Sequence, residues 1–414
     1  MSIKKNIGFL IGGTALAQVF TFAISPILTR LYTPESFGVL GIVLAASSII
    51  AVFAHLRLNL AIAQSNNINE ANIILKTSIF FSILICLLSS IFLILSNIIF
   101  NNSYTFIIVA FVFSVSLANV LIDIFNYWQS YRNKHSLNAR NSVFRSLLTG
   151  GFQILLGFIT NFGLILGFLI GSVGSLILFL KEYISSSDKK TNSILSSKKI
   201  TFVLKKYKSF PLYSMPQGFI ASASLNSVPL ILGASFGIAF AGQYWLAYRI
   251  LLAPIALIGG AYRQVLHPIF SNNKIKVENR IRNARKHTWL FLILIIPIIT
   301  IFFIFSESLF NLIFGLNWVI AGKIAAWLVL CFMLDIVKIP SICLAIGLNL
   351  QQKIMIFEVV LGVCRLLSVL LSLNFNNPIL SVKIFSVVSL IFSLILIFLV
   401  LYKWAPKKNY MGND

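Results

Sequence analysis

Charged side chains inside long apolar segments are the residues of this sequence that could do chemistry. The basic ones outnumber the acidic ones, and those that we assign to a binding site are Arg30, Arg57, Arg249, Arg263, Lys338 and Arg365. The acidic ones are Asp123, Asp335 and Glu358. A charge in an apolar setting is costly unless it faces a cavity or a partner, and these acids cannot neutralise so many cations. The excess predicts a site for an anionic ligand. Arginine suits phosphate because its planar guanidinium donates two parallel hydrogen bonds.

Spacing places two of these arginines on one helix. Arg249 and Arg263 are fourteen residues apart, which is two heptads, so they share a face of the predicted helix and lie about 21 Å apart along it. We expect Arg249 near the middle of the apolar segment and Arg263 near its end, as two steps of a cationic ladder. The alternative is that each guanidinium reaches water or bonds the carbonyl groups of a neighbouring helix.

The three acids are the candidates for carrying a coupling ion. Asp123 can bind a proton or a cation, although a hydrogen bond between helices would also explain an acid at that position. Asp335 and Lys338 are one helical turn apart and can form an ion pair. Glu358 and Arg365 are seven residues apart, so they share a helix face without touching.

Twelve apolar stretches of membrane-spanning length position these residues. A helix needs about 20 mostly apolar residues to cross the hydrocarbon core, and a soluble fold that is 58% hydrophobic and 10% charged would have almost no polar surface. The sequence therefore predicts an all-α polytopic membrane protein. The predicted spans are 7–31, 37–63, 73–100, 104–130, 142–160, 162–180, 211–235, 240–268, 288–310, 320–348, 354–374 and 378–402.

Basic residues gather in every second gap between the spans, and this pattern orients the chain. They precede the first span and follow every even-numbered one except the second, whereas the alternate gaps hold no lysine or arginine. Positive charge stays on the cytoplasmic side during insertion, which predicts two cytoplasmic termini and an even number of spans. Most of the net charge of +23 comes from these basic residues in the predicted cytoplasmic segments. The basic loops are short and lack interleaved aromatic residues, so no nucleic-acid partner is expected.

A basic, serine-rich linker at 181–208 divides the chain. It separates a predicted N-terminal lobe of six helices at 1–180 from a C-terminal lobe of six helices at 209–402, and a cytoplasmic tail follows at 403–414. Phe37-Gly38 in the first half is echoed faintly by Ala241-Gly242 in the second. Six spans in each half give both halves the same orientation, which is the parallel-repeat layout of transporters. We therefore expect two parallel six-helix lobes with the substrate path between them.

Motifs of catalysis, metal binding and cofactor binding are missing from the sequence. It contains no phosphate-binding loop of the GxxxxGK type, no HExxH, no paired cysteines and no nucleophile elbow. The predicted external loops are too short for a catalytic domain. We expect no catalytic residue, no metal and no cofactor. Any energy for transport must come from an ion gradient or from the supply of substrate.

Several runs of residues are distinctive of a known family. In the second half they are Lys206-Tyr207-Lys208-Ser209-Phe210-Pro211-Leu212-Tyr213-Ser214-Met215-Pro216 and Phe240-Ala241-Gly242-Gln243-Tyr244-Trp245-Leu246-Ala247-Tyr248-Arg249. In the first half they are Ser25-Pro26-Ile27-Leu28-Thr29-Arg30-Leu31-Tyr32-Thr33-Pro34-Glu35 and Tyr127-Trp128. Over about residues 8–270 the chain resembles the Wzx-type oligosaccharide flippases of the multidrug/oligosaccharidyl-lipid/polysaccharide exporter superfamily.

The resemblance implies a substrate and a place in the cell. Wzx-type flippases move undecaprenyl-pyrophosphate-linked oligosaccharide repeat units from the cytoplasmic to the outer leaflet of the bacterial inner membrane, by alternating access, for O-antigen in lipopolysaccharide biosynthesis or for another surface polysaccharide. The implied partners are this glycan lipid, the membrane lipids, a polysaccharide polymerase and a chain-length regulator. Family members look like pairs of six-helix lobes around a central cationic cavity, which the resemblance implies for this chain too. Arg30 and Arg249 fall on positions that are basic in this family. One departure is Arg57-Leu58-Asn59, where the family often has Arg-Tyr-Glu, and the missing acid weakens the case for ion coupling there.

Related functions are the alternatives. A peptidoglycan-precursor flippase and a cation-coupled multidrug efflux protein belong to the same superfamily, but the former typically has fourteen spans and the latter usually has an acidic cavity. A teichoic-acid or capsule-unit exporter would use the same mechanism as an O-antigen flippase. A membrane enzyme is disfavoured by the short external loops.

Overall fold

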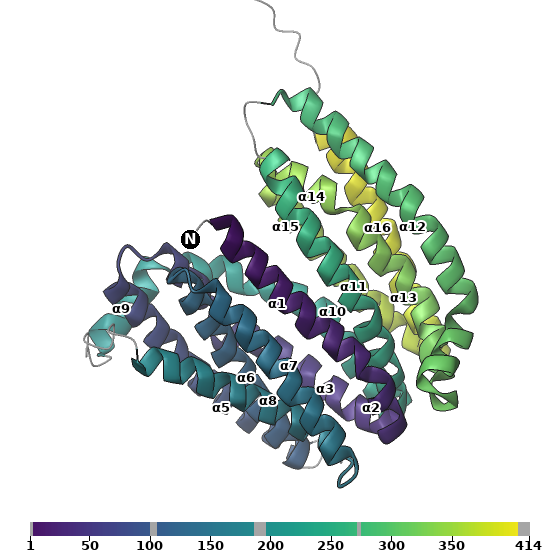
Figure 1. The fold of residues 1–414 in the computed structure, drawn as a ribbon, viewed down its shortest axis with the longest axis horizontal. Coiled ribbons are helices and arrows are strands. Elements are labelled where there is room, and N and C mark those ends of the chain that lie inside the picture. The colour runs from purple at the N-terminus through teal and green to yellow at the C-terminus, as the bar shows by residue number, and fades with distance from the viewer. Residues whose placement is uncertain (1–2, 100–105, 186–195, 271–274, 405–414) are drawn as a thin grey trace, which may run out of the picture. The chain divides into compact units, whose positions relative to one another are not determined.

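The protein is helical, and no strand occurs in the part of the chain that is described (Figure 1). The computed structural model describes residues 3–99, 106–185, 196–270 and 275–404, without the side chains of 3–11, 97–99 and several positions between 256 and 268. The chain forms two compact units, Met1–Gly242 and Gln243–Asp414. The boundary between them falls inside one continuous helix, α11 (Ile238–Phe270).

The first unit contains ten helices and two short helical turns before α11 begins, counted over its described residues. They are α1 (Ile3–Ala23), α2 (Ser25–Leu31), α3 (Pro34–Ala54), α4 (Leu58–Ala61), η1 (Ile62–Gln64), α5 (Ile68–Ile99), α6 (Phe106–Tyr131), α7 (His135–Gly157), α8 (Gly163–Ser185), α9 (Ser197–Lys206), η3 (Phe210–Ser214) and α10 (Met215–Phe236).

The second unit continues from α11 through five further helices, again over its described residues. These elements are α12 (Val277–Phe314), η4 (Leu316–Trp318), α13 (Val319–Val337), α14 (Ile339–Gly347), α15 (Gln351–Ser372), η5 (Leu373–Phe375), α16 (Pro378–Phe398) and η6 (Leu399–Trp404). α13 packs against α12 and α16, and α16 also packs against α15.

Local backbone breaks divide the first, second and tenth predicted spans, the last of them at Lys338 between α13 and α14. In the first span the helix breaks at Ile24 and restarts as α2 with Pro26 in its first turn, where the missing N–H of proline costs little. In the second span α3 ends before Leu56 and Arg57, which adopt positive φ angles of 49° and 56°. The prediction of one continuous helix over 37–63 was wrong, because the left-handed turn has no glycine or proline to signal it.

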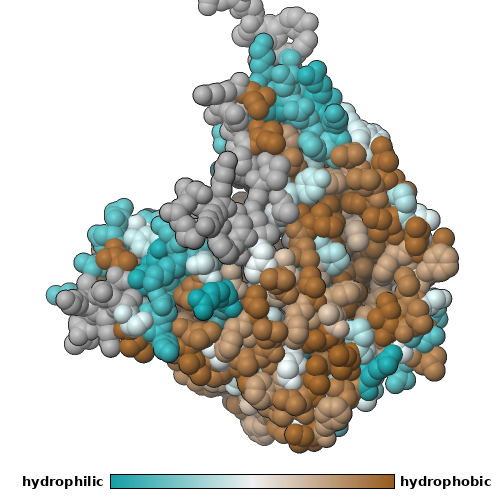
Figure 2. Space-filling model, in the orientation of Figure 1, coloured by the Kyte–Doolittle hydropathy of each residue, from teal (hydrophilic) through white to brown (hydrophobic). Residues whose placement is uncertain are grey.

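Eleven helical runs among the described residues are long and apolar enough to cross a membrane. Large apolar side chains are exposed along them, such as Phe92 at 70%, Ile304 at 64% and Leu371 at 64%. Figure 2 shows hydrophobic residues over much of one face, with hydrophilic residues mostly toward its edges. Apolar surface of this extent requires lipid around it. The chain is therefore a multi-pass, all-α membrane protein.

The remaining predicted span, 142–160, corresponds to α7. This helix has 23 residues and contains Arg140 and Arg145, and it is not among the eleven. α7 packs closely against α1 and α8. A Cβ added at Gly167 of α8 would lie 2.6 Å from the backbone nitrogen of Gln153, so the two helices meet at their backbones. The even count of twelve stays a prediction.

Two turns that flank α7 can test whether it crosses the membrane. We expect a reporter inserted after Asn133 to be cytoplasmic and one inserted after Asn161 to be external, because the first turn lies among basic residues and the second does not. Alkaline-phosphatase and fluorescent-protein fusions report the two sides. Reporters that read the same side at both positions would show that α7 does not cross, and the twelve-span topology would be wrong.

Two glycines allow α3 and the start of α11 to cross at backbone contact. A Cβ added at Gly38 would lie 2.8 Å from the carbonyl carbon of Ile238, and one added at Gly242 would lie 2.7 Å from the backbone nitrogen of Gly38. Real Cβ atoms essentially never approach other atoms within 3.0 Å. Any other residue at either position would push the two helices apart. These are the two glycines that the sequence echo pairs.

α10 packs along α3 and so belongs to the first unit. The hydroxyl of Ser222 donates to the carbonyl oxygen of Ser48 at 3.1 Å, and the ring centroids of Phe53 and Phe219 are 4.6 Å apart. The compact first unit therefore extends past the predicted linker at 181–208. The division into two lobes of six helices was predicted from the repeat in the sequence, whereas the two compact units are defined by packing contacts. The two-lobe division therefore stays a prediction.

The linker helix α9 is anchored to α5 through the buried carboxylate of Glu70. Lys206 donates a hydrogen bond to this carboxylate, the hydroxyl of Tyr207 donates to it at 2.9 Å, and the backbone N–H of Asn66 donates at 3.1 Å. The hydrogen bond with Glu70 raises the pKa of Lys206. These bonds fix the end of the basic linker on the first unit.

Candidate functional site

Arg57 occupies the left-handed turn between α3 and α4. Its backbone N–H donates to Nδ1 of His55 at 3.1 Å, which requires that ring nitrogen to be unprotonated. Its guanidinium lies against Gly218 of α10, where an added Cβ would come within 2.7 Å of Nε. This Nε is buried and has no hydrogen-bond partner among the described residues. A half-buried arginine with an unused donor, held by a strained backbone, is a candidate anion-binding group.

Arg145 of α7 links three helices of the first unit. Its Nη2 donates to Oδ1 of Asn119 on α6 at 2.7 Å and to the hydroxyl of Ser172 on α8 at 3.0 Å. The guanidinium also lies 5.0 Å from the ring centroid of Phe168. Sequence reasoning did not assign Arg145 to the site, although an arginine in a predicted span was the available signal.

Asp123 on α6 is within electrostatic reach of both arginines. Arg145 and Arg57 are the cations whose charges act on it, and Tyr127, one turn further along α6, is acted on by Asp123 and Arg57. Asp123 is exposed and forms no direct ion pair with a described residue. Arg57, Asp123 and Arg145 make up what we call the first-unit cluster. It holds two cations and one acid that can take up a proton.

Arg30 lies in the last turn of α2. Its side chain is exposed and forms no hydrogen bond or ion pair with a described residue. A basic residue in the last turn also interacts favourably with the helix dipole. Its predicted role in binding the substrate therefore stays a prediction.

Lys338 is buried at the break between α13 and α14 and is held by two acids. Its Nζ lies 2.8 Å from Oδ1 of Asp335 and 3.8 Å from Oε1 of Glu358 on α15. The ion pair that the one-turn spacing of Asp335 and Lys338 allowed is thus present. Two carboxylates and one ammonium give this second-unit triad a net negative charge. The triad is better suited to a proton or a small cation than to phosphate.

Arg365 is buried between α15 and α16. Its Nε donates to the hydroxyl of Ser389 at 2.8 Å, and its guanidinium lies 5.7 Å from the ring centroid of Phe385. These contacts engage the guanidinium in helix packing. Glu358 contacts Lys338 across helices and does not pair directly with Arg365.

Arg249 is half-buried on α11 and forms no hydrogen bond or ion pair with a described residue. Gln243, six residues earlier, fixes this helix to the start of α13. Its Nε2 donates to the carbonyl oxygen of Asn317 at 2.6 Å, and its Oε1 accepts from the backbone N–H of Ala321 at 2.9 Å. The side chain of Arg263 lies outside the described residues, so the ladder of two arginines stays a prediction. Gln243 was quoted in the sequence runs, but its positioning role could not be predicted.

The fold is that of a class of membrane transporters. It is similar to an inward-facing MATE family multidrug resistance transporter of the MOP superfamily, with a TM-score of 0.64 and 14% identity over 97% of this chain and 94% of that one. It is similar to the lipid II flippase MurJ in an inward closed conformation, with a TM-score of 0.73 and 15% identity over 93% of this chain and 86% of that one. It is also similar to the eukaryotic MATE transporter AtDTX14, with a TM-score of 0.59 and 15% identity over 97% of this chain and 95% of that one. At these identities the likeness concerns the fold alone.

The sequence of this chain matches the model of one protein family. A family model described as polysaccharide biosynthesis protein matches residues 27–322. Because the match covers most of the chain, this protein belongs to that family of polysaccharide biosynthesis proteins. None of the curated proteins matches the sequence significantly. The predicted polytopic helical fold is confirmed, and the three solved structures named above are two transporters and a flippase.

Proposed function

We propose that this protein is a flippase for undecaprenyl-pyrophosphate-linked oligosaccharide repeat units in the bacterial inner membrane. The proposal is supported by a transporter-like fold in a member of a polysaccharide biosynthesis family. It is also supported by two arginines of this chain whose guanidinium groups have free hydrogen-bond donors among the described residues. Nε of Arg57 has no described hydrogen-bond partner, and Arg249 has no described partner at all. Arg57 lies in the turn that follows the second span and Arg249 lies inside α11, and guanidinium groups in such a setting are suited to an anionic substrate.

The physical problem that such a flippase solves is the charge of the lipid pyrophosphate. A desolvated anion is very costly in hydrocarbon, so the head group needs cationic side chains along its path. The polar glycan needs a hydrated or polar route, whereas the polyprenyl tail can stay in the lipid. The product would serve O-antigen or another surface polysaccharide, with a polymerase and a chain-length regulator acting on it in the outer leaflet.

Reconstituted vesicles test the proposal directly. The full chain is placed in proteoliposomes that contain a fluorescent undecaprenyl-pyrophosphate disaccharide, and dithionite quenching measures how fast the labelled head group crosses the bilayer. We expect faster crossing than in protein-free vesicles. No acceleration for the disaccharide lipid, with lipid II or a cationic dye moved instead, would overturn the proposal.

A peptidoglycan-precursor flippase is the second candidate. The specific observation in its favour is the TM-score of 0.73 with a lipid II flippase, and lipid II also has an undecaprenyl pyrophosphate. Faster crossing of labelled lipid II than of the disaccharide lipid in the same vesicles would select this function.

Asp123 is the acid that we propose for ion coupling. Protonation would raise the net charge of the first-unit cluster from +1 to +2 and so strengthen its attraction for the pyrophosphate. Asp123→Asn holds the cluster at +2 at every pH, so release of the pyrophosphate should be impaired. We expect transport to slow about tenfold, within the usual range of coupling free energies, and the difference in rate between pH 6 and pH 8 to disappear. Glu358→Gln and Asp335→Asn test the second-unit triad in the same vesicles.

Glu278→Gln is the control for Asp123→Asn, because it removes an exposed carboxylate from the first turn of α12. We expect it to leave both the rate and its pH dependence unchanged. An Asp123→Asn protein that keeps the rate and the pH dependence of the wild type would show that Asp123 carries no coupling proton.

A further inference from the structure

A large groove lies in the first unit, outside the clusters described above. It has a volume of about 1230 Å³ and is bounded by α1, α7 and α8. Drug-sized ligands occupy pockets of roughly 300–1,000 Å³, so this groove has room for a lipid. α1 and α7 close it on one side, since a Cβ added at Gly13 would lie 2.6 Å from the Cβ of Ala139.

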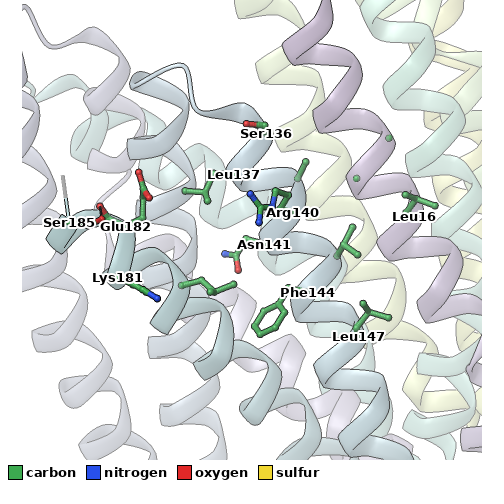
Figure 3. Close-up of a pocket in the computed structure, with 15 residues that line it drawn as sticks. Leu16, Ser136, Leu137, Arg140, Asn141, Phe144, Leu147, Lys181, Glu182 and Ser185 are labelled. Carbon is green, nitrogen blue, oxygen red and sulfur yellow. Dashed lines mark hydrogen bonds between the residues drawn. The ribbon is translucent and has the colours of Figure 1, made fainter.

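The lining of the groove changes from charged to apolar along two helices (Figure 3). On α7, Arg140 is followed at helical spacing by Phe144 and Leu147. On α8 the order is reversed along the chain, and Leu178 precedes Lys181. The charged ends of both helices therefore lie together, and the apolar stretches extend from them in the same direction. Such a gradient matches a lipid with its head group at the membrane surface and its chains in the hydrocarbon.

The charges at the head of the groove favour an anion. Arg140 and Lys181 are exposed and form no ion pair with a described residue. The one acid in the lining, Glu182, is already paired with Lys134. The two cations belong to the end of the bundle that the basic loops mark as cytoplasmic. Basic pockets between transmembrane helices on this side bind the head groups of anionic lipids.

We propose that this groove is a binding site for an anionic phospholipid of the cytoplasmic leaflet. The phosphate of the lipid contacts Arg140 and Lys181, and an acyl chain lies along Leu16, Phe144 and Leu147. The inference does not depend on which substrate the protein moves, because it concerns a separate surface of the first unit.

Native mass spectrometry and thermal unfolding of the full chain in detergent test the site. We expect dioleoylphosphatidylglycerol to remain bound and to raise the unfolding temperature more than dioleoylphosphatidylcholine does. In the double variant Arg140→Gln/Lys181→Gln, affinity for phosphatidylglycerol should fall roughly 30-fold, because each basic side chain near an anionic lipid contributes about one kcal/mol. Arg282→Gln/Lys286→Gln is the matched control, since it removes the same charge from exposed positions on α12.

A second variant tests the apolar part of the groove without changing its charge. Gly12 lines the groove, and a Cβ added there meets nothing within 4 Å, so Gly12→Leu has room for its first carbon and adds an apolar side chain to the lining. We expect it to lower phosphatidylglycerol binding and to leave the unfolding temperature without lipid unchanged. Equal binding of the two phospholipids by the wild type, or unchanged phosphatidylglycerol binding in both groove variants, would overturn the proposal. Displacement of phosphatidylglycerol by undecaprenyl phosphate at equal concentration would instead assign the groove to the substrate lipid.

Discussion

Replacing Arg249 with alanine is expected to lower the affinity for the lipid pyrophosphate about a hundredfold while the protein stays at normal abundance. Losing a bidentate contact with phosphate removes a few kcal/mol of binding free energy, and about 2.7 kcal/mol corresponds to a hundredfold. Folding should change little, because Arg249 has no described partner that would be left unpaired. Arg249→Lys should restore only part of the affinity, because lysine keeps the charge but loses the planar geometry.

Surface polysaccharide in a strain that lacks the wild-type gene measures this effect, and an immunoblot checks the protein level. The matched control is Arg282→Ala on α12, where the guanidinium is exposed and bonds only Asn279 at 3.1 Å among the described residues. We expect the control to support normal polysaccharide. Full polysaccharide with Arg249→Ala at normal abundance would show that this arginine packs helices and does not bind the substrate.

Replacing Gly242 with alanine is expected to destabilise the first unit by about 3 kcal/mol or more, at the upper end of the cost of overpacking. The added methyl group would meet the backbones of Pro34 and Gly38, which cannot move away as a flexible side chain can. Gly38→Ala should have a similar effect, since it would meet the backbone of Ile238. Both variants should be less abundant in the membrane and unfold at lower temperature in detergent.

Gly151→Ala is the matched control for the two crossing glycines. Gly151 also lies in a helix, α7, but a Cβ there meets nothing within 4 Å. Alanine is favoured over glycine in a helix by up to about 1 kcal/mol, so this variant should be as stable as the wild type or slightly more so. If Gly242→Ala and Gly151→Ala unfold at the same temperature, the close crossing of α3 and α11 does not limit stability.

Most helices could be predicted from the sequence because a membrane span needs a long apolar run. The predicted span 104–130, for example, is observed as α6. The left-handed turn at Arg57 could not be predicted in this way. It depends on an acceptor nitrogen from His55 and on the space that Gly218 leaves in α10. Neither interaction has a periodic signature, and the second comes from a distant part of the chain.

The candidate site could be predicted only as a list of charges. Spacing along one helix found the pair of Asp335 and Lys338, because both partners lie on the same chain segment. It could not find Glu358 as the second partner of Lys338, or Ser389 as the partner of Arg365, since these lie on other helices. Which cations are engaged and which are available to a ligand is decided by packing between helices. Contacts between helices that are distant in the sequence leave no periodic pattern from which these partners could be predicted.

The contacts of Arg145 have a consequence for how the chain enters the membrane during synthesis. An arginine near the centre of a helix costs about 2.5–3.5 kcal/mol on insertion. Asn119 is made before Arg145, but Ser172 is made after it. We infer that α7 inserts stably only once α8 has emerged from the ribosome, so that the two helices enter the bilayer as a hairpin. Stable insertion of α7 in chains that are truncated before Gly163 would contradict this order.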